Sequence, residues 1–213
     1  MPGRKGIEEI LGIELKRENI IGVELIPLTW IVAPYVTEEQ LKAWREKGWI
    51  DNEGLFLDRA FPRDYLGRPF IFRFWLESPM VRAARLLNMD SKIGRDWRII
   101  DIINLERLEV VPTDYIIIPR KPLRYRRVVF SGKSTTTQFF EYIDSTFSLR
   151  FNVLASNPAD FRRVMIKAGE IGMMAMSKHG YGRFTVKFIE PFTRGEVEEE
   201  KEKPVHKKDD RNK

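Results

Sequence analysis

Glycines and basic side chains gather in residues 169–188, GEIGMMAMSKHGYGRFTVKF, which begin like the end of a helix and finish like a strand. Glycine has no side chain, so it lets a backbone come close to another group. Lys178 and Arg183 lie in this stretch, and we therefore expect that group to be a phosphate. His179 could act here as a general acid. An ordinary polar loop histidine is the favoured interpretation.

A second basic cluster, RKPLRYRRV at residues 120–128, surrounds a tyrosine with arginine and lysine. In an extended segment Arg124 and Arg126 share one face, and Tyr125 and Arg127 share the other. Spaced guanidinium groups match phosphate geometry, and the tyrosine ring offers a stacking surface. An edge strand protected by charge has the same pattern, so both interpretations stay open. The candidates here are Arg120, Lys121, Arg124, Tyr125 and Arg126.

Arg82 and Arg85 are a third basic pair. They lie three residues apart in ESPMVRAARLLNM, residues 77–89, where apolar residues recur at helical spacing. Residues three apart share one face of a helix. We expect both arginines to point to water or to a phosphate.

The residues suited to catalysis are few. Asp51, Glu53, Asp58 and Asp64 fall in one long loop, where a carboxylate could assist metal-dependent or general-base RNA cleavage. Their spacing defines no site, and ordinary loop carboxylates are the favoured interpretation. FSGKSTTT contains GKS, but a phosphate-binding P-loop needs a glycine where Arg127 stands. We therefore place Lys133 on a hairpin turn.

Composition narrows the class of protein. There are no cysteines and two histidines, which excludes disulfides and thiolate metal sites, and no metal or cofactor is expected. The net charge is +6, and residues 196–213 hold seven acidic and six basic side chains, so the rest of the chain is the more basic part. A basic body favours polyanion partners, nucleic acid first. No apolar run is long enough to span a membrane, and we expect a cytoplasmic protein with no membrane partner.

Helical and strand patterns alternate along the chain. Helix patterns cover residues 7–17, 37–48, 78–88 and 157–168. Thr37 and Gln40 have capping-box spacing, and Ser78 with Pro79 predicts the start of the third helix. Strand patterns cover residues 20–36, 68–76, 97–105, 108–119, 126–130, 135–143, 146–155 and 183–188. We expect the charged tail, residues 196–213, to be disordered.

The chain resembles the RAMP superfamily of CRISPR-associated RNA-binding proteins. In that family a glycine-rich loop ending in G-aromatic-G-[RK]-aromatic precedes the last strand of a ferredoxin-like βαββαβ domain. The match here is Gly180-Tyr181-Gly182-Arg183-Phe184. A second family segment, G-x-P-x-I-x-G-S-x-x-[KR]-G-x-[LA]-R, is similar to GRPFIFRFWLESPMVRAARLL from Gly67, although Glu77 and Ala83 stand where the family has glycine.

The resemblance implies that such loops approach an RNA backbone closely. Members that process precursor RNA rely on a histidine near the N-terminus, which this chain lacks; members that cut target RNA use a loop aspartate, and Asp51, Asp58 and Asp64 all remain candidates. The expected contacts are Lys178, Gly180, Tyr181, Gly182 and Arg183 in the loop, with the basic candidates above.

Together these patterns predict one α+β domain over residues 1–195, with a ferredoxin-like (RRM-like) βαββαβ core and a β-rich insert over about 48–130. The expected function is to bind crRNA or other single-stranded RNA as one subunit of a CRISPR-type complex with other proteins. The target strand is a further candidate partner. A RAMP-type endoribonuclease, and a viral or mobile-element nucleic-acid-binding or assembly protein of the same fold, are the alternatives.

Overall fold

A computed structural model describes residues 12–131, 134–174 and 180–193. Within these ranges the chain is a mixed α+β protein with antiparallel sheets and the α-helices α2 (Glu38–Glu46), α3 (Phe74–Leu86) and α4 (Pro158–Ile171). Lys178, His179 and the tail at 196–213 lie outside the described residues, as does Lys133.

The largest sheet has five strands. Their order is β10 (Phe184–Ile189), β1 (Ile20–Pro27), β9 (Leu149–Ala155), β4 (Trp97–Asn104) and β5 (Glu109–Thr113), and every neighbouring pair is antiparallel. Side chains alternate between its faces, as a period of two requires. Val23 and Val153 belong to one buried cluster, whereas Ile20 and Leu154 belong to another on the opposite face.

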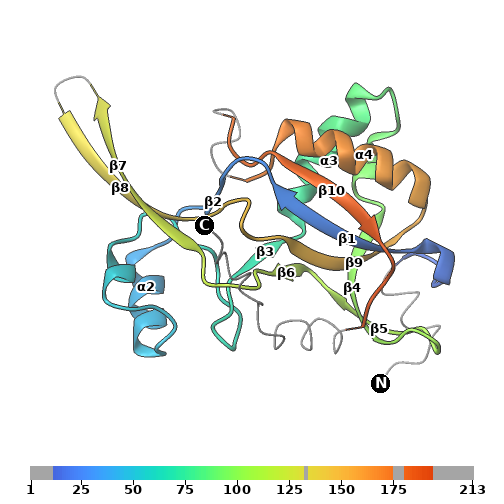
Figure 1. Ribbon diagram of the computed structural model, residues 1–213, viewed down its shortest axis with the longest axis horizontal. Helices are drawn as coiled ribbons and strands as arrows, with labels where there is room; N and C mark the ends of the chain where they lie inside the picture. Colours follow the sequence, from blue (N-terminus) through green and yellow to red (C-terminus); the bar gives the residue numbers. More distant parts are fainter. Residues whose placement is uncertain (1–11, 132–133, 175–179, 194–213) are drawn as a thin grey trace, which may run out of the picture.

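Helices α3 and α4 cover one face of this sheet (Figure 1). Helix α4 begins as predicted, because the Asn157 side chain accepts a hydrogen bond from the Asp160 N–H and Pro158 occupies the first turn. Its apolar stripe, Phe161, Val164 and Ala168, is buried against the sheet. The prediction for this helix is confirmed.

The remaining strands build a second part of the molecule. Strands β7 (Leu123–Ser131) and β8 (Ser134–Ile143) form a long hairpin that extends away from the five-stranded sheet (Figure 1), and β2 (Ile31–Val32) pairs with the base of β8. Helix α2 has the predicted Thr37–Gln40 capping box and, with the 3-10 helix η2 (Glu53–Phe56), lies beside the hairpin base. Strands β3 (Phe70–Phe72) and β6 (Tyr115–Ile117) form a third sheet.

Three sequence expectations about these elements were wrong. Residues 68–76 form a strand only at Phe70–Phe72, and α3 starts at Phe74, so Ser78 is not its N-cap and Pro79 lies inside the helix. The helix continues through Pro79 because Leu76, Met80 and Ala83 are buried on one continuous stripe. Residues 20–36 break into two strands after Pro27, since proline cannot donate to a ladder. Residues 12–16 are not helical, and the short 3-10 helix η1 covers Arg17–Asn19.

The segment expected as an insert, 48–130, includes α3 and β4, which belong to the large sheet and its helical layer. The elements outside the large sheet and its two covering helices come instead from two segments, 28–73 and 114–148. Within the described residues no helix has the length and apolar character that crossing a membrane requires.

Candidate nucleic-acid interface

The end of the glycine-rich segment is fixed to the turn between β1 and β2. The Arg183 N–H donates to the Thr29 hydroxyl oxygen (2.9 Å), and the Arg183 carbonyl accepts from the Leu28 N–H (2.8 Å). The Gly182 N–H donates to the Trp30 carbonyl (2.8 Å). These bonds engage only backbone atoms of Arg183, and the residue is exposed.

Trp30 is the centre of an aromatic cluster at the hairpin base. Its ring stacks on Tyr142 with centroids 4.3 Å apart, meets Tyr125 edge to face at 5.1 Å and lies 6.4 Å from Tyr181. Tyr125 and Tyr181 are both predicted RNA contacts, and the structure brings both to one indole. The Tyr125 side of the cluster is open to solvent, since that residue is 42% exposed.

Two of the glycines serve the turn itself rather than an external group. Gly172 (φ 84°) and Gly182 (φ 76°) adopt left-handed backbone conformations. A Cβ on Gly182 would lie 2.0 Å from the Met173 carbonyl oxygen, and the Met173 N–H donates to the Gly182 carbonyl (3.0 Å). Gly180 (φ 86°) differs, because a Cβ there would meet no atom of the described residues within 4 Å. With respect to the described part of the chain, Gly180 alone of these three has open space beside its backbone.

A groove lies beside the glycine-rich segment. It has a volume of about 300 Å³ and is lined by α3 and by the chain that follows α4, with Phe74, Ser78 and Arg82 facing Gly172 and Met174. Phe74 is 53% exposed. The structure therefore brings residues 74–82, from the second family-like segment, beside residues 172–174 of the glycine-rich stretch. Arg85 lies on the same helix and is exposed, but it does not line the groove.

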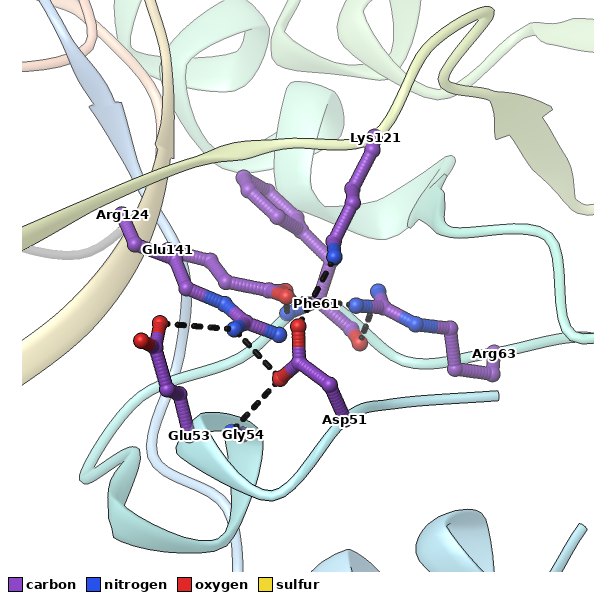
Figure 2. Close-up of polar contacts among 8 residues, drawn as sticks. All are labelled: Asp51, Glu53, Gly54, Phe61, Arg63, Lys121, Arg124 and Glu141. Atoms are coloured by element: carbon purple, nitrogen blue, oxygen red, sulfur yellow. Dashed lines mark hydrogen bonds and ion pairs between the residues drawn. The ribbon is translucent and has the colours of Figure 1, made fainter. Parts of the chain in front are cut away.

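The basic cluster at 120–128 is divided between different neighbours. Arg124 points inward: its side chain is 11% exposed, and Nη1 lies 2.6 Å from Asp51 Oδ1 and 3.7 Å from Glu53 Oε2 (Figure 2). Lys121 Nζ also reaches Asp51, at 3.0 Å. Arg120, Arg126 and Arg127 are exposed. As predicted, Arg124 and Arg126 lie on one face of the strand and Tyr125 on the other.

Asp51 is the acceptor that joins this hairpin to the loop before η2. Hydrogen bonds from Arg124, then from Lys121 and the Gly54 N–H, hold the pKa of its carboxyl well below the usual value despite partial burial. Such a carboxylate is a weak proton acceptor, and its oxygens already accept from three donors. Asp51 is therefore a poor candidate for a general base.

A second charged pair lies deeper in the same junction. Arg63 and Glu141 are 3% and 0% exposed, and Arg63 Nη2 lies 2.6 Å from Glu141 Oε1 (Figure 2). The Phe61 N–H donates to Glu141 Oε2 (3.0 Å), and Arg63 Nη1 donates to the Phe61 carbonyl (2.8 Å). This closed network fixes the loop containing Phe61 against β8.

The other two loop aspartates have separate roles. Burial raises the pKa of Asp64, but hydrogen bonds from the Arg68 side chain and backbone outweigh it and leave the pKa lowered. Asp58 is exposed, and its Oδ2 accepts from the Phe139 N–H (2.7 Å). The three aspartates do not share a site. Among the described residues no cluster of His, Asp or Glu is arranged to hold a metal ion.

Trp30 and Tyr142 are the site residues that the sequence analysis missed. Residues 20–36 read as one strand, which hides the turn that places Trp30 beside Gly182. The signal was Pro27 followed two residues later by Thr29 and Trp30, a break in the strand that carries an aromatic residue. Tyr142 gave no comparable signal, because it alternates normally within β8.

No protein-family model matches the sequence, and no curated protein matches it. Among solved structures, the chain is similar to one in the cryo-EM structure of the Type III-B Cmr-beta bound to cognate target RNA, with a TM-score of 0.53 and 13% identity over 87% of this chain. The present chain covers 65% of that chain's length. A second match, the crystal structure of Thermofilum pendens Csc2, has a TM-score of 0.27 and 10% identity over 80% of this chain and 65% of that one, too weak to support a shared fold. At 13% identity the first likeness shows a common fold.

Proposed function

We propose that this chain is a single-stranded RNA-binding subunit of a CRISPR-type ribonucleoprotein complex, where it binds crRNA alongside other protein subunits. One observation carries the proposal. Tyr125 and Tyr181, from segments far apart in the sequence, meet on Trp30 beside the glycine-rich turn and the exposed Arg183. Aromatic rings next to arginines and open backbone are the usual surface for unpaired nucleotides.

The fold supports the same assignment. We assign the chain a ferredoxin-like βαββαβ core with one extra edge strand, β5; the strand order β10-β1-β9-β4, with α3 after β1 and α4 between β9 and β10, supports this assignment. We therefore assign residues 12–193 to one RAMP-type domain. The similar chain from the Cmr-beta structure belongs to an assembly bound to target RNA, and we extend this role to the present chain as part of the proposal.

The geometry ranks the candidate contacts. Arg82 in the groove beside α3, Arg183 after the turn and Arg126 on the hairpin are exposed, and in the part of the chain that the structure describes none of them is joined to a carboxylate by an ion pair. Arg124 is largely buried against Asp51, so its role here is to hold the hairpin base. Gly180 offers the open backbone, and Tyr125 and Tyr181 offer rings.

The test is the salt dependence of RNA binding by fluorescence anisotropy. Each phosphate contact on a single strand contributes about 0.7 to the slope of log affinity against log salt. Arg82→Ala with Arg183→Ala should therefore lower the slope by about 1.4 and weaken binding of every RNA sequence alike. The matched control is Arg107→Ala, an exposed arginine in the turn after β4.

A salt-independent affinity, or a control variant that weakens binding as much as the double variant, would contradict the proposal. Recovery of the native chain without RNA and without partner subunits would contradict it as well. Arg85→Ala and Arg120→Ala test two other predicted contacts, whose side chains line neither the groove nor the aromatic cluster.

A further inference from the structure

A second pocket lies between the hairpin and the η2 segment, on the hairpin face opposite Tyr125. Its volume is about 450 Å³, within the range of small-molecule sites. Strand β7 and its partner β8 supply Arg126, Thr137 and Phe139. The η2 helix and the loop after it supply Glu53, Phe56 and Asp58. Tyr125 and Arg126 are consecutive, so the strand presents its tyrosine to the Trp30 cluster and its arginine to this pocket.

The walls of this pocket are aromatic and one of them is unusually open. Phe56 is 76% exposed, although burial of its apolar ring surface would stabilise the protein. Phe139 is partly buried against the small core around Leu41 and Ile50. Two rings in one pocket give a planar ligand surfaces on which to stack.

The charged groups in the pocket have opposite signs and remain available to contact a ligand. Asp58 is held in place because its Oδ2 accepts from the Phe139 N–H and its own N–H donates to the Phe139 carbonyl (both 2.7 Å). The Glu53 side chain is 80% exposed and touches Arg124 only at 3.7 Å. Among the described residues no ion pair joins Arg126 to either carboxylate.

This combination fits a nucleotide better than a charged side chain of another protein. A lysine or arginine would gain from Glu53 and Asp58 but would leave Arg126 without an anionic partner. A nucleotide has a planar base for the rings, N–H donors on its edge for the carboxylates and a phosphate for the arginine. Of these two ligand classes, the nucleotide has a group for the rings, for the carboxylates and for the arginine.

The carboxylates also discriminate between bases. Guanine presents two adjacent donors, N1–H and N2–H, on its Watson–Crick edge, whereas uracil presents one donor between two acceptors. Ionised Asp and Glu accept hydrogen bonds and cannot donate them, so uracil carbonyls would face carboxylate oxygens. We propose that this pocket binds one unpaired guanine of the RNA, with the base against Phe56 and Phe139, its edge on Glu53 and Asp58, and its phosphate on Arg126. This inference rests on the proposed RNA-binding function.

The experiment compares an oligouridine RNA with the same RNA carrying one guanine, by fluorescence anisotropy on the full chain. The guanine RNA should bind about tenfold more tightly. Glu53→Gln with Asp58→Asn should abolish that difference, because amides present N–H donors as well as acceptors. The amide oxygen that replaces the Asp58 carboxylate can still accept from the Phe139 N–H, so the loop should keep its place. Phe56→Ala should weaken the guanine RNA by about tenfold and leave oligouridine unchanged.

The controls match the changes in charge and exposure. Glu46→Gln with Glu109→Gln removes two exposed carboxylates elsewhere and should keep the guanine preference. Tyr65→Ala removes an aromatic ring that is also 76% exposed and lies outside the pocket, and it should leave both affinities unchanged. A guanine preference that survives the Glu53/Asp58 change, or its absence from the unmodified chain, overturns the inference.

A titration with GMP and UMP, followed by NMR, separates the two proposals. If RNA binds but GMP binds no better than UMP and Phe56→Ala has no effect, the pocket is not a guanine site while the proposed function stands. If GMP binds and the RNA does not, the guanine site stands and the proposed function fails. Binding of arginine methyl ester in place of GMP would assign the pocket to a partner protein and overturn the inference.

Discussion

Gly182→Ala and Gly180→Ala separate two reasons for placing glycine in the same turn. Both residues have positive φ, 76° and 86°, so each substitution puts a side chain in the left-handed region at a cost of about 1–2 kcal/mol. Of the two, only Gly182 has a described atom in the way of the new Cβ, the Met173 carbonyl oxygen at 2.0 Å. Relieving such a contact by backbone shifts costs about 1–3 kcal/mol more.

Gly182→Ala should therefore lower the free energy of unfolding by about 2–5 kcal/mol, against about 1–2 kcal/mol for Gly180→Ala. The measurement is chemical denaturation followed by tryptophan fluorescence. Because Gly182 donates to the Trp30 carbonyl, the Gly182 variant should also change the fluorescence of the native state. The Gly180 variant should leave it unchanged.

When both variants are folded, the order of their losses in RNA affinity should differ from the order of their losses in stability. Gly180→Ala adds a methyl group to the open backbone where we place the RNA, so it should weaken binding by more than its small effect on stability implies. Equal losses of stability in the two variants would refute the close-contact argument. A Gly180 variant with unchanged RNA affinity would refute the role given to its open backbone.

Two further predictions concern the hairpin base. Arg63→Met leaves the fully buried Glu141 carboxylate unpaired and should lower the free energy of unfolding, measured with denaturant, by about 3–5 kcal/mol. Arg63→Met with Glu141→Gln removes the unpaired charge and keeps an oxygen that accepts from the Phe61 N–H, so it should recover part of that loss; equal losses would show that the ion pair is not the cause. The pKa of Asp51 in the folded protein lies below its ordinary value of 3.8, so its contribution to stability is present at neutral pH and is lost as the pH falls below about 4. Asp51→Asn should therefore make the free energy of unfolding less dependent on pH in the acid range. An unchanged pH profile would contradict the stabilising role given to Asp51.

The periodic elements were predictable because local and tertiary preferences agree in them. β9, α4 and β10 form where alternation and helical spacing place them, with Asn157 and Pro158 at the start of the helix. α3 was harder. Ser78-Pro79 is a strong local start signal, but burial of Leu76 favours a helix that starts more than one turn earlier, at Phe74. A single sequence does not reveal that tertiary contribution.

The site was predictable in its residue types and less so in its contacts. Arg183, Tyr181 and Tyr125 were singled out, yet Trp30, which joins the two tyrosines, depends on a turn that the strand pattern concealed. The glycines were expected to approach a phosphate, whereas Gly182 approaches the Met173 carbonyl. Sequence spacing cannot distinguish these, because both require the same missing side chain.

The alternation of one strand accounts for the division of the basic cluster. Cross-strand pairs place Arg124 beside Glu141 and Arg126 beside Phe139 on one face of the hairpin, while Tyr125 pairs with Phe140 on the other. Arg124 lies close to the body and is neutralised by Asp51, whereas Arg126, two residues further out, is exposed and forms no ion pair with any described residue. Position along the hairpin thus decides which arginine stabilises the fold and which can meet a phosphate. An RNA strand that contacts both Tyr125 and Arg126 must pass around an edge of the hairpin, because the two side chains lie on opposite faces.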